Sequence, residues 1–270
     1  MPLSEVIGYV AVFLMGVTLG VIGAGGSILT LPILVYLFGV DVTLATAYSL
    51  VLVGATAATA ASRHVVRGEL DYEALLTFGL PSVLGVYLSR RYLLPAVPEV
   101  VGSLGPLELT RDLLVMLIFA GFMLAAAFLM IRGRPAGGDD RRERRLTVGR
   151  VGLAALEGLV VGAITGFVGA GGGFLIVPAL VWLLGLSIRK AVTTSLAVIA
   201  VKSLLGFLGD LQVSRSVDWL FLLGLLALSA LGILVGMRAG RRLDPHHLQL
   251  GFGWFVLATA LFVLARELLA

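Results

Sequence analysis

The sequence predicts an all-α polytopic membrane protein made of two inverted five-segment repeats, each with a broken helix at a Gly-rich break. Three observations carry this prediction: hydrophobicity along the whole chain, a duplicated glycine-rich segment, and basic residues gathered on one side. Of the 270 residues, 59% are hydrophobic and 13% are charged, and the mean hydropathy is +1.05. Soluble domains carry about 25% charged residues, so most of this chain must lie against lipid or other membrane segments.

Ten hydrophobic segments follow one another along the chain. Eight are long enough to cross a bilayer core of about 30 Å, at 5–22, 43–62, 72–89, 112–131, 149–168, 191–209, 217–237 and 248–265. The other two, 27–39 and 173–185, would reach only about 20 Å as helices. Each follows a glycine cluster and contains a proline, Pro32 or Pro178. We therefore expect two half-helices that do not cross the membrane alone.

The two short segments belong to a duplicated unit. Residues 20–50 and 166–196, compared at an offset of 146, are identical at 14 of 31 positions. The shared residues include a GAGG run, at 23–26 and 169–172, and the proline that follows it. Two apolar stretches rarely share such a run and a proline through composition alone. We divide the chain into a first transmembrane repeat, 1–131, a basic cytoplasmic linker, 132–150, and a second transmembrane repeat, 151–270.

Basic residues predict the orientation of the segments. If all ten segments cross, 14 of the 20 Lys and Arg residues fall in loops on one side, and Lys202 falls inside a span. The positive-inside rule makes that side cytoplasmic. The other side receives Arg90, Arg91, Arg111, Arg215 and Arg266. Because five segments per half is odd, the halves are inverted and both termini lie outside. We expect the cytoplasmic membrane as the location, and an ordered external loop at 93–109.

The glycine breaks indicate an anion-binding site. Irregular backbone persists inside a bilayer only where protein or water satisfies it, and the first N–H groups of a helix attract anions. In inverted repeats the two short helices would begin from opposite sides and point to the midplane, as is typical of secondary transporters. The alternative is that these glycines only allow close helix packing. The expected contributors are Ala24, Gly25, Gly26, Ser27, Gly171, Gly172 and Gly173.

Polar residues inside the predicted spans extend the site. Lys202 would attract an anion; the alternatives are that it reaches the interface or pairs with Asp210. Glu157 is the proton-coupling residue that we expect, unless it pairs with a cytoplasmic arginine. Hydroxyl groups after each short segment could donate to an anion, although Ser and Thr also bond to helix carbonyls. These hydroxyls belong to Tyr48, Ser49, Thr194 and Ser195.

The duplicated motif G-x-x-G-A-G-G-(G/S)-x-x-x-x-P, with the basic central loop, resembles the TauE/SafE sulfite exporter family, also called the toluene sulfonate uptake permease family. The resemblance covers the whole chain, including the Thr-Thr-Ser-Leu stretch at 193–196. It implies movement of sulfur-containing or other organic anions. The first copy has Ser27 where the second has Gly173, which makes the two sides of the site unequal. The family motif carries over to Gly25, Gly26, Gly171, Gly172, Pro32 and Pro178.

Together, these observations predict a secondary transporter of small sulfur-containing anions, such as sulfite or sulfoacetate, that works by alternating access and couples to the proton gradient. A passive anion channel, or a permease for another small organic anion, is the alternative. The sequence has no cysteine, no ATP-binding motif and no histidine cluster, so we expect neither an enzyme nor a bound cofactor or metal. The expected partners are a small anion and the lipid bilayer; a homo-oligomer is compatible with the sequence, and nucleic acid is not expected.

Overall fold

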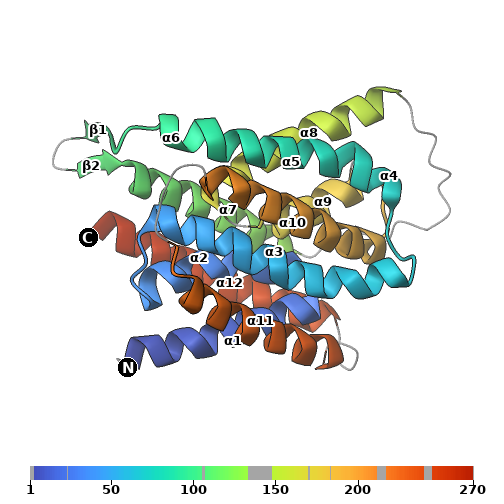
Figure 1. Cartoon of the computed structure of the whole chain (residues 1–270), viewed down its shortest axis with the longest axis horizontal. Coiled ribbons are helices and arrows are strands. Elements are labelled where there is room, and N and C mark those ends of the chain that lie inside the picture. The colour runs from blue at the N-terminus through green and yellow to red at the C-terminus, as the bar shows by residue number, and fades with distance from the viewer. Residues whose placement is uncertain are drawn as a thin grey trace.

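Seven long apolar helices make up most of the protein in the computed structural model. The structure describes residues 3–22, 24–104, 107–132, 148–169, 171–182, 184–211, 217–239 and 245–269. Within these ranges, seven helices are long and apolar enough to cross a membrane (Figure 1). They are α1 (Leu3–Ile22), α3 (Val42–Val66), α7 (Arg111–Arg132), α8 (Val148–Val168), α10 (Ile188–Leu211), α11 (Trp219–Ala239) and α12 (Pro245–Leu269). The predicted all-α polytopic membrane class is therefore confirmed.

The remaining long segment, 72–89, begins a longer helix that contains two π-helical segments. It runs without a gap through α4 (Tyr72–Ala74), η3 (Leu75–Gly79), α5 (Leu80–Leu88), η4 (Ser89–Leu93) and α6 (Leu94–Ala96). The helix therefore continues well beyond residue 89. This corrects the expected place of Arg90, which lies inside η4 and not in an external loop. Such π turns often mark functional sites in membrane and soluble helices alike.

Both short segments form short helical pieces, as the sequence predicts. After the first break, η1 (Ala24–Leu29), α2 (Thr30–Pro32) and η2 (Ile33–Leu37) follow one another directly. After the second, α9 covers Gly173–Trp182. Gly169 and Gly172 have φ angles of +73° and +72°, which glycine adopts without the steric cost of a Cβ. The second break therefore depends on glycine for its backbone path. Gly23 and Ala170, which belong to the GAGG runs, lie outside the described residues.

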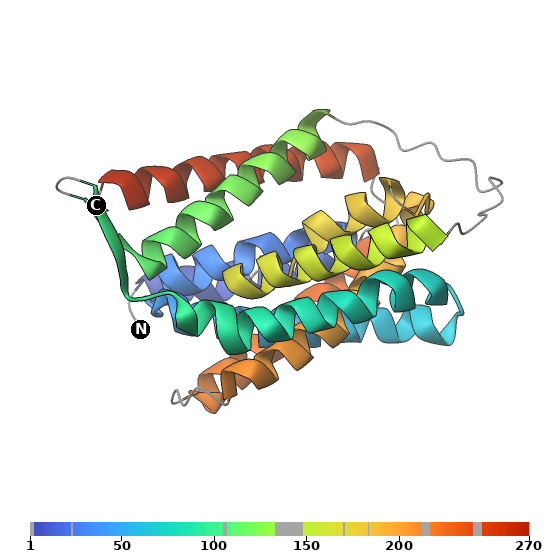
Figure 2. The ribbon, with the colours of Figure 1, turned by 90° about the horizontal axis from the view of Figure 1, so that it is seen from above.

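The expected external loop is an antiparallel β-hairpin. Strands β1 (Val100–Leu104) and β2 (Leu107–Thr110) pair with Gly102 opposite Leu109. The hairpin lies at the same end of the bundle as the start of α1 and the end of α12 (Figures 1 and 2). The start of α8 lies toward the opposite end, and residues 133–147 of the predicted linker lie outside the described residues. Which end faces the cytoplasm stays a prediction.

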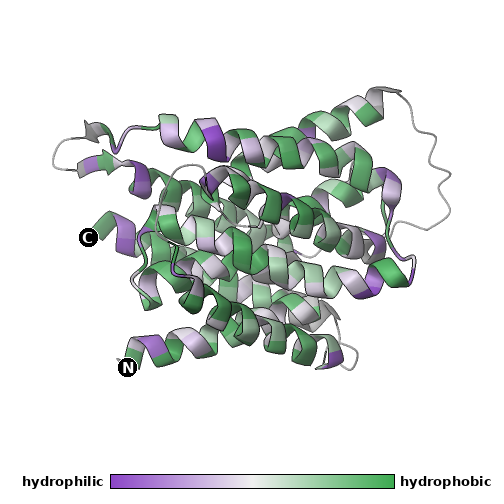
Figure 3. Ribbon diagram, in the orientation of Figure 1, coloured by the Kyte–Doolittle hydropathy of each residue, from purple (hydrophilic) through white to green (hydrophobic). Residues whose placement is uncertain are grey.

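Helices α3 and α10 lie side by side at the centre of the molecule. Their spans are 78% and 72% buried by protein, whereas the other five spans are 28–39% buried. The outer helices therefore expose large apolar side chains, such as Leu14, Leu84 and Leu223, toward the lipid. Hydrophilic residues gather mostly toward the two ends of the bundle (Figure 3). A site for a polar substrate is thus best shielded from lipid along α3 and α10.

Glycines at equivalent positions of the two repeats allow outer helices to pack closely. A Cβ added at Gly16 of α1 would collide with the Ser229 carbonyl oxygen of α11, and one added at Gly162 of α8 would collide with the Ser82 carbonyl oxygen of α5. Gly162 is the repeat counterpart of Gly16. Each half thus packs its first helix against the fourth helix of the other half. This agrees with the predicted duplication, while the inverted relation of the halves stays a prediction.

Candidate functional site

The two glycine breaks meet beside α3. A Cβ added at Gly171 would lie 3.3 Å from the Cβ of Ser27 and would collide with the side chain of Val53. Ser27 is completely buried and belongs to η1, which Ala24, Gly25 and Gly26 begin. Residues of the first and second breaks are therefore in contact, as the prediction of two half-helices that point to one region requires.

Lys202 lies directly at the second break. Its side chain is 1% exposed, and its Nζ donates to Thr165 Oγ1 at 2.6 Å. A Cβ added at Gly172, the residue before α9, would lie only 2.9 Å from Lys202 Nζ. The side chain therefore does not reach the interface. Among the described residues, Lys202 makes no ion pair, and the Asp210 carboxylate pairs instead with Arg90.

The break and Lys202 together form a small cationic region. The N–H groups of Gly173 and Phe174, the first two of α9, have no helical carbonyl ahead of them, because a helix leaves its initial donors unpaired. The carbonyl of Gly172, by contrast, already accepts from the N–H groups of Leu175 and Ile176, each at 3.0 Å. An ammonium without a carboxylate partner inside a membrane protein is costly. A small anion bound here would reduce that cost.

Three of the four predicted hydroxyls already have backbone partners. The Asp218 N–H donates to Tyr48 Oη at 2.8 Å, and the Asp71 N–H donates to Thr194 Oγ1 at 3.0 Å. Tyr48 and Thr194 are repeat counterparts, so both halves use the same residue position to hold the loop before a following helix. Ser195 Oγ donates to the Val192 carbonyl at 2.8 Å. A substrate-binding role for these three residues stays a prediction.

Ser49 and Glu157 differ from those hydroxyls because they have polar atoms that remain unpaired. Ser49 Oγ is buried and has no hydrogen-bond partner within the described part of the chain. The same holds for Glu157 Oε2, on α8. Glu157 thus makes no ion pair with an arginine of the described ranges. Its predicted role in proton coupling stays a prediction.

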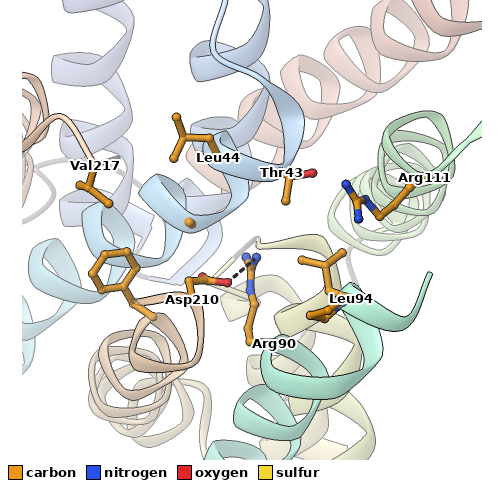
Figure 4. A pocket seen from close by; sticks show the side chains of 10 residues that line it. Thr43, Leu44, Arg90, Leu94, Arg111, Asp210 and Val217 are labelled. Atoms are coloured by element: carbon orange, nitrogen blue, oxygen red, sulfur yellow. Dashed lines mark hydrogen bonds and ion pairs between the residues drawn. The ribbon is translucent and has the colours of Figure 1, made fainter. Parts of the chain in front are cut away.

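A cavity that the sequence did not predict opens at the hairpin end of α3 and α10. Its volume is about 260 Å³. Arg90 from η4, Asp210 from α10 and Arg111 from α7 extend toward this space (Figure 4). Arg90 is completely buried; its Nη1 donates to Thr46 Oγ1 at 2.9 Å and contacts Asp210 Oδ1 at 3.4 Å. The lining residues are Thr43, Leu44, Ala47, Arg90, Leu94, Pro95, Arg111, Phe207, Asp210 and Val217.

Arg90 is a candidate site residue that the sequence did not predict. The predicted hydrophobic segment ends at Ser89, before Arg90-Arg91, but Tyr92-Leu93-Leu94 continues it with apolar residues. That continuation is the signal that places Arg90 inside a helix. The close approach of α10 also depends on Gly209, since a Cβ there would lie 3.0 Å from the Arg90 Cβ.

One face of α3 joins the cavity to the glycine break. Thr46 accepts the hydrogen bond from Arg90, and a Cβ added at Gly169 would collide with Thr46. Val53 contacts Gly171, as described above. Ser49 lies between them on the same helical face, because residues three and four apart are neighbours on a helix. A line of buried polar groups therefore leads from Arg90 toward Gly171 and Lys202.

Comparison with known proteins places the chain in a family. The sequence model of the family described as Sulfite exporter TauE/SafE matches residues 8–263. A protein of Xylella fastidiosa (strain 9a5c) named "Probable membrane transporter protein" is 32% identical over 94% of this chain and 92% of its own length. The "Probable membrane transporter protein YunE" of Bacillus subtilis is 27% identical over 90% of each chain. No solved structure matches this chain. The family match spans nearly the whole sequence, and the chain therefore belongs to the TauE/SafE sulfite exporter family.

Proposed function

We propose that this protein is a secondary transporter that carries a small anion across the cytoplasmic membrane, and that the anion binds where the two broken helices meet Lys202. One observation carries the proposal: the Lys202 ammonium is buried against Gly172 at the second break, and no carboxylate of the described residues pairs with it. Transporters bind anionic groups at the N-termini of broken helices, and ionisable residues inside the membrane commonly mark the substrate path.

A sulfur oxyanion or a small organosulfonate suits this site. The family is described by sulfite export, and sulfite and sulfonate groups present three oxygens. One oxygen can accept from Lys202 Nζ while the others accept from the first N–H groups of α9. Thr165 Oγ1, which Lys202 now contacts at 2.6 Å, would be released or shared as the anion binds. Because Gly172 has no Cβ, Thr165 and Lys202 can lie directly against the backbone at the start of α9.

The apolar core supports alternating access. Buried apolar side chains form two clusters, and the boundary between them falls between Leu52 and Val53 on α3. On α10, Phe207 belongs to the cluster at the hairpin end and Ala200 to the other, so the boundary passes Lys202. An apolar cluster on each side of a polar site would block the path at both ends. Opening one cluster at a time would then expose the site to one side only.

Transport by reconstituted protein tests the proposal. Proteoliposomes containing the purified protein should accumulate labelled sulfite or sulfoacetate under an imposed proton gradient, and an uncoupler should abolish the accumulation. Lys202→Met should lower substrate affinity by about tenfold or more, because a charged hydrogen bond contributes about 1.5–3 kcal/mol. Lys190→Met is the matched control, since Lys190 lies exposed on the same helix and is the only other lysine.

The outcomes separate the proposal from its alternatives. Equal transport by Lys202→Met and Lys190→Met would contradict the midplane site. Flux that follows the membrane voltage and is indifferent to the proton gradient would indicate the passive channel. Accumulation of a carboxylate in preference to every sulfur anion would indicate a permease for another organic anion. Glu157 is the first residue to test for a role in proton coupling, because its buried Oε2 has no partner in the described ranges.

A further inference from the structure

The cavity at the hairpin end contains arginine donors that the protein leaves unused. Arg90 is completely buried, yet its Nε and Nη2 have no hydrogen-bond partner within the described residues. The same is true of the buried Nε of Arg111, whose Nη1 contacts the Val97 carbonyl at 3.5 Å. Unsatisfied donors of a buried guanidinium are costly. These three nitrogens therefore indicate an acceptor group that would lie between the two arginines.

The charges of the cavity determine what this acceptor can be. Arg90 and Arg111 contribute two positive charges and Asp210 one negative charge, so the three residues together carry one net positive charge. The Nε and Nη2 of one guanidinium form a fork that binds two oxygens of one group side by side. A monoanion with at least two oxygens on its head group matches both the charge and the donors.

The remaining walls of the cavity are apolar. Leu44, Ala47, Leu94, Phe207 and Val217 surround the space in front of Arg90. A purely inorganic anion would leave these walls against water, whereas a short hydrocarbon tail would cover them and gain about 25 cal/mol for each Å² removed from water. The site therefore favours an organic anion over an inorganic one of equal charge.

We propose that this cavity is a second anion site, which binds a small organic monoanion by its oxyanion head between Arg90 and Arg111 and by its short apolar tail against Leu94 and Phe207. It is separate from the Lys202 site: Asp210 is eight residues after Lys202 on α10, about 12 Å along the helix. The inference rests on the proposed transport function, because the site would receive the anion at the hairpin end of the path toward Lys202.

Asp210 acts as an internal competitor for the anion. Its Oδ1 lies 3.4 Å from Arg90 Nη1, which is longer than the usual 2.7–2.9 Å of a charged hydrogen bond. The anion would bind the same guanidinium more closely, through Nε and Nη2, and would repel the Asp210 carboxylate. Removal of this carboxylate charge should therefore raise the affinity of the site.

Equilibrium binding to the full-length protein in nanodiscs tests this proposal. The probes are 1-propanesulfonate and the inorganic monoanion nitrate, with methanesulfonate and 1-pentanesulfonate to vary the tail. Arg111→Gln should weaken propanesulfonate binding by about tenfold, while the matched control Arg91→Gln should leave it unchanged, because Arg91 does not line the cavity. Asp210→Asn should strengthen binding by a few-fold to about tenfold. Leu94→Ala should shift the preference from propanesulfonate toward pentanesulfonate.

Each result has a defined meaning. Equal binding by Arg111→Gln and Arg91→Gln, equal binding of nitrate and propanesulfonate, or weaker binding by Asp210→Asn would overturn the proposal. Leu94→Ala keeps the test valid even if a change at a buried arginine prevents folding, because a structural defect would not shift the tail-length preference. Lys202→Met distinguishes the two sites: it should impair transport while propanesulfonate still binds at the cavity. If Arg111→Gln leaves both transport and propanesulfonate binding unchanged, the cavity site is refuted and the proposed transport function is not.

Discussion

Gly172→Ala is the change that most directly tests the packing of the proposed anion site. Gly172 has a φ of +72°, and an added Cβ would collide with Thr165 Cγ2 and lie 2.9 Å from Lys202 Nζ. A left-handed alanine costs about 1–2 kcal/mol, and overpacking of a filled interior costs about 1–3 kcal/mol more. We expect Gly172→Ala to lower the free energy of unfolding by about 2–5 kcal/mol.

The chain offers a matched control for the backbone part of this cost. Gly185 has a similar φ of +61°, and nothing lies within 4 Å of a Cβ added there. Gly185→Ala should therefore lose only about 1–2 kcal/mol. The difference between the two variants measures the contact with Thr165 and Lys202. Denaturant unfolding in micelles, monitored by tryptophan fluorescence, gives both free energies.

A double variant locates the contact. Thr165→Ser removes the colliding Cγ2 and keeps the hydroxyl that Lys202 contacts. The Thr165→Ser change should therefore restore part of the stability that Gly172→Ala loses, and it should not change the Gly185→Ala variant. If Gly172→Ala and Gly185→Ala are equally destabilised, or if Thr165→Ser restores neither or both, the packing of Gly172 against Thr165 and Lys202 is refuted.

Two further predictions concern the repeat and the predicted hydroxyls. Gly16→Ala and Gly162→Ala should each destabilise the protein by about 1–3 kcal/mol, because each added Cβ would meet a backbone carbonyl of a facing helix; unequal losses in an unfolding titration would contradict the matched packing of the two halves. Tyr48→Phe should cost about 1 kcal/mol of stability, because Tyr48 Oη accepts from the Asp218 N–H, and it should also lower sulfite affinity if the hydroxyl hydrogen donates to the anion as predicted; unchanged affinity in the binding assay would contradict the substrate role of Tyr48.

Hydropathy and the repeat predicted most of the fold because both depend on local sequence. Segment length alone indicated that 27–39 and 173–185 are half-helices, and the helices there are short. Lys202 was recognisable because it interrupts an apolar run, and its burial agrees with a position inside the protein. Backbone partners were harder to foresee. Nothing in the sequence indicates that the Thr194 hydroxyl accepts from the Asp71 N–H, since that contact depends on how two distant segments pack.

Arg90 escaped prediction for a related reason. An arginine at the end of an apolar segment normally marks the membrane interface, and only the π turns of η3 and η4 and the three-dimensional position of Thr46 and Asp210 place it in the interior. The cavity also needs residues from α3, α6, α7 and α10 at once. No spacing within one segment could have brought Thr43, Leu94, Arg111 and Asp210 together.

The two repeats pack their helices alike but differ in buried charge, and this difference affects the electrostatic environment of an anion that crosses the protein. The counterpart of Lys202 is Thr56, which is hydrogen-bonded to Ser229 at 2.9 Å. Ser82 and Ser229 make equivalent helix contacts in the two halves, and eight residues after them stand Arg90 and Met237. Met237 packs against the apolar cluster away from the hairpin. Arg90 lies on the hairpin side of Lys202, and the repeat equivalents of these two residues, Met237 and Thr56, are neutral. With the halves inverted as predicted, an anion would meet positive charge on the approach from the hairpin end and apolar side chains on the other approach. These two positions would then make the path through the duplicated helices unequal.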